Sequence, residues 1–177
     1  MVLRDNRRHT LSNTLVIVEG PTDEGFIKGI AEKLRARCKV LIMRGNRADK
    51  AYRLLEDHIG EFNKAAVLKD VHRAGRDTTS IIDQLASRIK QLETQEIQLR
   101  VFSVKRSIEA WILAGLCLNN PEEILNPEEE LKKLMQREGK PYIKSPESYK
   151  RIADEIDIEK AKKTSKTFKD FIDFLTT

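Results

Sequence analysis

The feature that most constrains the fold is a short apolar run, Leu15-Val16-Ile17-Val18, which stops abruptly at the carboxylate of Glu19. The run has no polar alternation, which is typical of a strand that is covered on both faces. Gly20-Pro21 then turns the chain. A helical pattern follows, and its inward stripe consists of Phe26, Ile27, Ile30, Ala31 and Leu34. This order of strand, turn and helix predicts the first unit of an α/β fold.

The same unit recurs along the chain. Apolar strands are predicted at residues 40–43, 65–68 and 97–102, and helices at residues 48–59, 81–92 and 108–118. Four strands that alternate with helices and are joined by short turns favour a parallel sheet with helices on both faces.

The pattern changes at residue 119. Four prolines, at positions 121, 127, 141 and 146, separate short amphipathic segments near residues 131–135, 149–156 and 168–175. Each segment is too short to be a stable helix alone, so we expect the segments to pack on the sheet domain. The predicted organisation is an α/β domain at residues 13–118 and a helical extension at residues 119–177.

The composition of this chain of 177 residues indicates its cellular compartment and the distribution of its charge. No apolar run approaches the ~20 residues of a membrane span, and no signal-peptide pattern opens the chain. Cys38 and Cys117 lie far apart beside apolar residues, which predicts reduced core thiols and a cytoplasmic protein without a membrane partner. The net charge is +5, and residues 1–110 carry 21 Lys and Arg against 15 Asp and Glu. The basic excess therefore belongs to the predicted sheet domain.

Acidic residues follow three of the four predicted strands. Because the carboxyl ends of parallel strands face one edge of a sheet, these residues should meet there. Carboxylates gathered in this way suit Mg²⁺ or Mn²⁺, which can activate water for phosphodiester cleavage. Glu19, Asp23 and Asp70 are the predicted metal ligands. The predicted catalytic residues, with Ser107 beside them, are Glu19, Asp70, His72 and Glu109.

Basic residues collect at the same predicted edge. They would attract a phosphate backbone, with an affinity that falls as the salt concentration rises. Nucleic acid, DNA or RNA, is therefore the expected partner. The predicted phosphate-contacting residues are Arg44, Arg47, Lys69, Arg73, Arg76, Lys105 and Arg106.

Each of these residues also has a simpler interpretation. Charged residues make up 34% of the chain, so charge in the loops can be mere solvated surface. His72 can be a metal ligand, a phosphate contact, a general base or a plain surface residue. Glu109 can simply favour the amino terminus of its helix electrostatically. Trp111 lies in an apolar helix and is predicted to be a core residue.

Several segments of the sequence resemble a known protein family. The segment 16–23, Val-Ile-Val-Glu-Gly-Pro-Thr-Asp, followed by Phe26 and by an acidic motif after the third strand, resembles the Toprim domain of topoisomerases, primases and related nucleases. Its Val-Glu-Gly-x-Thr-Asp form is similar to the nucleases named for overcoming lysogenization defect. Residues 107–114 and 156–161, with Phe168, resemble small stand-alone Toprim-like proteins of uncharacterised function. The resemblance covers residues 13–118 and, through the tail, almost reaches the end.

This resemblance implies a Rossmann-like Toprim fold and Mg²⁺-dependent breaking or joining of phosphodiester bonds. The family's invariant Glu, a general acid or base in several members, corresponds to Glu19. Its Asp-x-Asp pair corresponds to Asp70 and, imperfectly, to His72, which lacks the second carboxylate. The resemblance therefore leaves open whether one or two metal ions bind. Asp23 matches an additional acid of the lysogenization-defect branch, and Glu109 matches a recurrent acid of the small proteins.

The leading hypothesis is a Mg²⁺- or Mn²⁺-dependent Toprim-like nuclease or phosphodiester-transfer enzyme that acts on DNA or RNA. One alternative is a Toprim-like nucleic-acid-binding or assembly module that keeps the fold but has no turnover, which the missing second Asp favours. Another is a phosphohydrolase of small molecules on a similar sheet. The sequence leaves the oligomeric state open, and a homodimer is compatible with it.

Overall fold

A computed structural model describes residues 13–44, 47–71, 83–84, 86–88, 90 and 97–177. The sheet region of this part contains, in order, β1 (Thr14–Val18), α1 (Pro21–Lys33), β2 (Cys38–Ile42), α2 (Ala48–Asp57), β3 (Lys64–Val71), β4 (Gln98–Lys105) and α4 (Ile108–Gly115). The 3-10 helix η2 (Pro121–Glu123) and the helices α5 (Pro127–Arg137), α6 (Pro146–Glu155), α7 (Ile158–Thr164) and α8 (Lys166–Thr176) follow. Much of the helix predicted at residues 81–92 lies outside the described residues; positions 83–84, 86–88 and 90 are helical.

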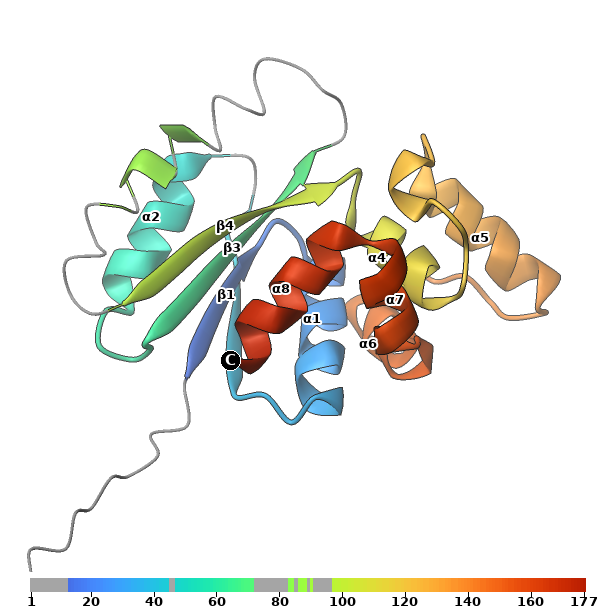
Figure 1. Ribbon diagram of the computed structural model, residues 1–177, viewed down its shortest axis with the longest axis horizontal. Helices are drawn as coiled ribbons and strands as arrows, with labels where there is room; N and C mark the ends of the chain where they lie inside the picture. The colour runs from blue at the N-terminus through green and yellow to red at the C-terminus, as the bar shows by residue number, and fades with distance from the viewer. Residues whose placement is uncertain (1–12, 45–46, 72–82, 85, 89, 91–96) are drawn as a thin grey trace, which may run out of the picture.

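The described strands form one parallel sheet in the order β2-β1-β3-β4. β1 lies between β2 and β3, with Val16 opposite Val40 on one side and Ala66 on the other. The carboxyl ends of these strands therefore meet at one edge. The predicted α/β fold, with a parallel four-stranded sheet and helices on both faces, is confirmed (Figure 1).

The two faces of the sheet bury two separate sets of apolar side chains. Val16 and Val18 pack in a cluster with Phe26 of α1, whereas Ile17 packs in a cluster with Leu55 of α2. Figure 1 shows α2 on one side of the sheet and α1 and α8 on the other. All five residues of β1 are buried, which explains why the run has no polar alternation.

β3 and β4 extend further than the sequence predicts. The predicted strands end at residues 68 and 102, whereas β3 continues to Val71 and β4 to Lys105, and the two strands pair along this length. Lys69 continues the buried strand because the carboxylate of Glu19 neutralises its charge. The strand was predicted to end too early because Lys69 and Asp70 are polar residues.

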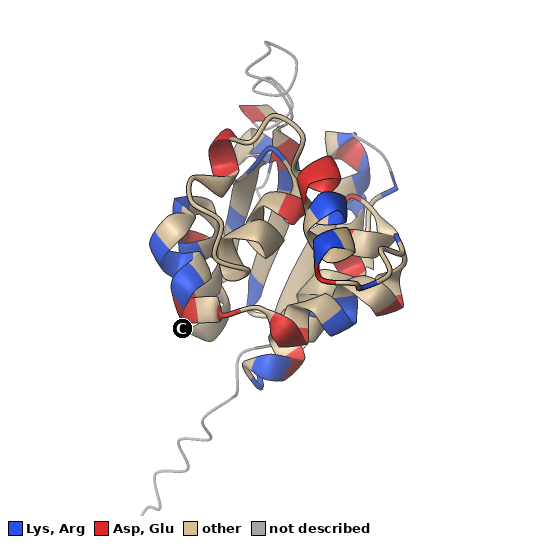
Figure 2. Cartoon of the chain, turned by 90° about the vertical axis from the view of Figure 1, so that its right-hand side faces the viewer, with Lys and Arg blue, Asp and Glu red and all other residues tan. Residues whose placement is uncertain are grey.

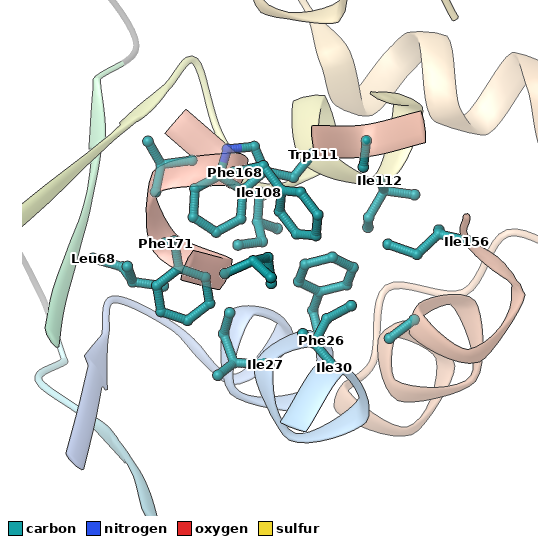
Figure 3. Packing of buried hydrophobic residues seen from close by; sticks show 14 of the residues in the cluster. Phe26, Ile27, Ile30, Leu68, Ile108, Trp111, Ile112, Ile156, Phe168 and Phe171 are labelled. Carbon is teal, nitrogen blue, oxygen red and sulfur yellow. The ribbon is translucent and has the colours of Figure 1, made fainter. Parts of the chain in front are cut away.

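The C-terminal helices share a hydrophobic core with α1 and α4. Trp111 of α4 stacks on Phe171 with ring centroids 5.5 Å apart and meets Phe168 edge-on at 5.3 Å. Figure 3 shows these rings beside Phe26 of α1. Trp111 is fully buried, and its indole nitrogen donates a hydrogen bond to Thr167 Oγ1 at 2.8 Å, so its predicted core position is confirmed. The core runs across residue 118, and the division at that residue stays a prediction.

Helix α6 packs unusually close to α1 because α1 has glycines at the contact. A Cβ atom at Gly25 would lie 2.1 Å from the carbonyl oxygen of Pro146, and one at Gly29 would lie 2.7 Å from that of Lys150. Only glycine, which has no side chain, allows the backbones of α1 and α6 to come this close. The contact fixes α6, and with it Tyr149, against the sheet domain.

None of the described helices is long and apolar enough to cross a membrane. Cys38 and Cys117 are both free thiols. Cys38 is partly buried, and burial raises its pKa to about 12. The prediction that Cys117 is a core thiol is wrong. α4 ends at Gly115, earlier than predicted, and Cys117 is exposed in the turn that follows, with a φ of 73°.

Candidate functional site

The carboxyl edge of the sheet carries a pocket of about 680 Å³. Four carboxylates of the sheet region, each from a separate element, line it together with Glu128 of α5: Glu19 after β1, Asp23 in α1, Asp70 in β3 and Glu109 in α4. Seen from the side that carries α5, acidic and basic segments lie close to one another (Figure 2). The remaining lining residues are Gly20, Thr22, Arg106, Ser107, Leu125, Asn126, Pro127 and Lys144.

The turn after β1 brings Glu19 and Asp23 to the same pocket. Gly20 has an extended backbone, Pro21 begins α1, and the Gly20 N–H donates a hydrogen bond to Asp23 Oδ2 at 3.1 Å. This bond caps the start of the helix, where the helix dipole also favours a carboxylate. Asp23 therefore has a structural function in addition to any chemical one.

Glu19 is held by two donors from β3. Its Oε1 atom accepts hydrogen bonds from the Lys69 ammonium and from the backbone N–H of Asp70, the latter at 3.1 Å. Lys69 is only 1% exposed. The expectation that Lys69 lies at the rim and grips phosphate is thus wrong, because its charge is buried against Glu19.

The carboxylates of the pocket repel one another. Burial raises the pKa of Asp70 from 3.8 to about 9, and the negative charges of Asp23, Glu19 and Glu109 raise it further against the opposing effect of Lys69. Burial likewise raises the pKa of Asp23 to about 6, although the Gly20 hydrogen bond lowers it. Burial and the neighbouring carboxylates therefore both favour the protonated forms of Asp23 and Asp70.

Glu109 lies in the first turn of α4 and is only 6% exposed. The hydroxyl of Tyr149, a fully buried residue of α6, donates a hydrogen bond to Glu109 Oε1 at 2.7 Å. Burial, with the charge of Glu109 as the next contribution, raises the pKa of Tyr149 above its usual range. The C-terminal extension thus takes part in the site.

The carboxylates of the pocket are of the type that binds a divalent cation, but they are not positioned to hold one in this structure. Among the described residues, no group of three or more His, Cys, Asp or Glu side chains is placed to hold a metal ion. Glu19, Asp23 and Asp70 nevertheless supply the carboxylate oxygens that Mg²⁺ and Mn²⁺ prefer. A cation between them would also relieve the repulsion that raises the pKa of Asp70.

The predicted basic residues are distributed unevenly around the pocket. Arg106 lines it, and Lys105 is exposed at the end of β4. Arg44 and Arg47 follow β2 and do not line the pocket; Arg47 forms an ion pair with Asp49 at 2.9 Å. Three further predicted site residues, His72, Arg73 and Arg76, lie outside the described residues.

Sequence reasoning missed the part of the site that comes from the extension. Tyr149, Tyr142, Glu128 and Lys144 all lie within or beside the pocket, yet none follows a strand of the sheet. One signal was available: a tyrosine on the inward stripe of a helix, such as Tyr149, needs a hydrogen-bond partner for its buried hydroxyl.

No family model matches this sequence, and no curated protein matches it. Among solved structures, the chain is similar to the C-terminal region of the Burkholderia pseudomallei OLD protein, with 16% sequence identity and a TM-score of 0.48. The match covers 91% of this chain and 98% of that chain. Similarity at this level assigns neither a family nor an activity.

Proposed function

We propose that this protein is a Mg²⁺- or Mn²⁺-dependent enzyme of Toprim type that hydrolyses or transfers phosphodiester bonds in DNA or RNA. One observation carries the proposal: carboxylates from β1, α1, β3 and α4 line a single pocket at the carboxyl edge of a parallel sheet. Open α/β sheets bind their ligands at this edge. Burial raises the pKa values of Asp23 and Asp70, and the neighbouring carboxylates add to the shift; perturbed pKa values of this kind are common at functional sites.

Within this proposal, Glu19, Asp23 and Asp70 hold the metal ion. When bound, the ion would supply Lewis-acid activation of water and would neutralise negative charge on the phosphate oxygens. Glu109 faces the reacting phosphate from α4, and His72 assists from the segment after β3. Lys69 orients the carboxylate of Glu19 when no metal is bound.

Cations around the pocket bind the phosphate backbone in this proposal. Arg106 and Lys144 line the pocket itself, and Lys105 extends the basic surface at the end of β4. Arg44, Arg47, Arg73 and Arg76 remain predicted contacts with more distant phosphates.

The decisive experiment compares the wild type with Glu19→Gln in the cleavage of single- and double-stranded DNA and RNA in the presence of Mn²⁺. Glu19→Gln keeps the shape of the side chain and removes the charge at the centre of the site. Glu159→Gln is a matched control, because Glu159 is exposed on α7, away from the pocket. We expect cleavage by the wild type and the control only. Equal cleavage by wild type and Glu19→Gln would show that the activity does not belong to this site.

A second candidate is a nucleic-acid-binding module without turnover. The ion pair between Lys69 and Glu19 favours it, because an ammonium already occupies a carboxylate that the metal would need. Metal titration separates the two functions. Affinity for DNA or RNA without any binding of Mg²⁺ or Mn²⁺ at millimolar concentration would support the binding module.

A further inference from the structure

Two exposed apolar side chains lie at the pocket, on the part of it that the C-terminal extension supplies. Leu125, in the connection between η2 and α5, lines the pocket and is 83% exposed. Ile143, in the connection between α5 and α6, is 51% exposed and directly precedes Lys144, which also lines the pocket. We call Leu125 and Ile143 the apolar rim.

The backbone on both sides of Leu125 is anchored. Ile124 packs against the hydrophobic core that α1 and α4 share with the extension. Asn126 caps α5, because its Oδ1 atom accepts a hydrogen bond from the Glu129 N–H at 3.4 Å. Leu125 is therefore directed into solvent by two fixed neighbours.

Ile143 is anchored in a similar way, through Glu128 in the first turn of α5. The Tyr142 hydroxyl donates a hydrogen bond to Glu128 Oε1 at 3.2 Å. On the other side of Ile143, Lys144 Nζ donates to Glu128 Oε2 at 2.6 Å. These contacts tie the connection that carries Ile143 to the start of α5, which directly follows the connection that carries Leu125.

The exposure of the apolar rim is selective. In the part of the chain that the structure describes, the exposed large apolar side chains are Leu125, Ile143 and Ile59, so two of the three belong to the pocket region. Covering such side chains with a ligand is favourable, because it removes apolar surface from water. Exposed apolar groups bordered by polar residues are typical of binding sites.

The chemistry beside the apolar rim indicates which ligand would cover it. Arg106 and Lys144 line the pocket and suit a phosphate. In a nucleic acid, the apolar surface nearest to a phosphate is the flat face of a base, since the sugar and the base edges are polar. Neighbouring bases cover this face inside a duplex, whereas Leu and Ile side chains contact it where stacking is interrupted. An unstacked base next to a bound phosphate therefore matches the rim and the cations together.

We propose that the apolar rim binds the face of an unstacked base beside the phosphate in the pocket, so that the site selects single-stranded or frayed nucleic acid over intact duplex. This inference rests on the proposed function, because it needs a nucleic-acid phosphate in the pocket. Every base has such a face, so the rim selects for an unpaired strand and reads no sequence. Leu125 and Ile143 thus determine specificity and take no part in the bond-breaking step.

Equilibrium binding tests the proposal without turnover. Fluorescence anisotropy compares the wild type with Leu125→Ser on labelled probes of equal length, made in DNA and in RNA. The probes are a single strand of thymine or uracil nucleotides, the same single strand without bases, and a duplex. Ca²⁺ replaces Mg²⁺ and Mn²⁺ in the buffer, because it also takes carboxylate oxygens as ligands. Gel electrophoresis after each titration verifies that the probes are intact.

We expect the wild type to bind the single strand with bases about five- to tenfold more tightly than the strand without them, given the apolar area of a Leu side chain. Leu125→Ser should lose this preference and keep the wild-type affinity for the strand without bases. Its ratio of single-strand to duplex affinity should fall by the same factor, and Ile143→Ser should lose part of the preference. Ile59→Ser is the matched control, because Ile59 is exposed after α2 and does not line the pocket.

Two binding results would overturn the proposal. One is equal affinity of the wild type and Leu125→Ser for the single strand with bases. The other is an equal loss on the strand without bases, because no base contact exists there to be lost. Sedimentation velocity tests a different occupant: a wild-type dimer that Leu125→Ser dissociates would make the rim an interface between copies, and the proposal would be wrong.

Cleavage assays separate this inference from the proposed function. If the wild type cleaves and Glu19→Gln does not, while Leu125→Ser still prefers single strands as strongly as the wild type, only the inference fails. If the wild type binds bases through Leu125 but cleaves nothing, the proposed enzyme function fails and the inference holds for a nucleic-acid-binding module. A wild type that binds no nucleic acid overturns both.

Discussion

Replacement of Asp70 by asparagine should stabilise the metal-free protein, and more so as the pH rises. The pKa of Asp70 is raised from 3.8 to about 9, mainly by burial and then by the neighbouring carboxylates. Between these two values the folded protein keeps a proton that the unfolded chain releases, so stability is lost as the pH rises through this window. Asparagine has the shape of the protonated acid and avoids this loss.

The magnitude depends on the width of the window. Each pH unit above the unfolded pKa contributes about 1.4 kcal/mol, which sets an upper limit of about 4 kcal/mol at about pH 7. Relaxation of the pocket reduces this value, so we expect Asp70→Asn to be about 2–4 kcal/mol more stable than the wild type at neutral pH. The difference should approach zero near pH 4, where Asp70 holds a proton in the unfolded chain as well.

Urea unfolding in the presence of a chelator measures this difference. Trp111 is the only tryptophan and is fully buried, so its fluorescence reports on unfolding. Asp154→Asn, at an exposed position of α6, is the matched control and should change stability little at any pH. A variant Asp70→Asn that is less stable than the wild type, or a gain that does not depend on pH, would refute the reasoning.

Two further substitutions test the packing and the charges around the pocket. Gly25→Ala should lower the free energy of unfolding in urea by about 2–3 kcal/mol, because its Cβ atom would meet the backbone of Pro146. Gly20→Ala should lower it far less, because the nearest atom to its Cβ would be 3.8 Å away. Equal losses in these two variants would contradict the close contact of α1 with α6. Lys69→Met should lower stability by about 3 kcal/mol, because the carboxylate of Glu19 loses its buried partner. A Lys69→Met variant as stable as the wild type would show that the pair contributes nothing.

Local sequence patterns predicted the parallel sheet because a strand that is buried on both faces has an apolar sequence without polar alternation. β1 shows this most plainly: each of its five residues is buried, and a run of branched apolar residues is what such a position requires. The same patterns placed Glu19, Asp70 and Glu109 at one edge, because the carboxyl ends of parallel strands all lie on the same side of the sheet. They misplaced Lys69, because its burial depends on the carboxylate of Glu19, which lies 50 positions earlier in the chain.

The contribution of the extension depended on contacts that no local pattern contains. Tyr149 reaches Glu109 across 40 positions of the chain, and it does so because glycines in α1 let α6 approach to backbone contact. A periodic pattern records only whether a side chain faces inward, and it does not record which side chain it meets. Sheet and helix types therefore follow from short-range chemistry, whereas the hydrogen-bond partners of the pocket arise only when distant segments pack together.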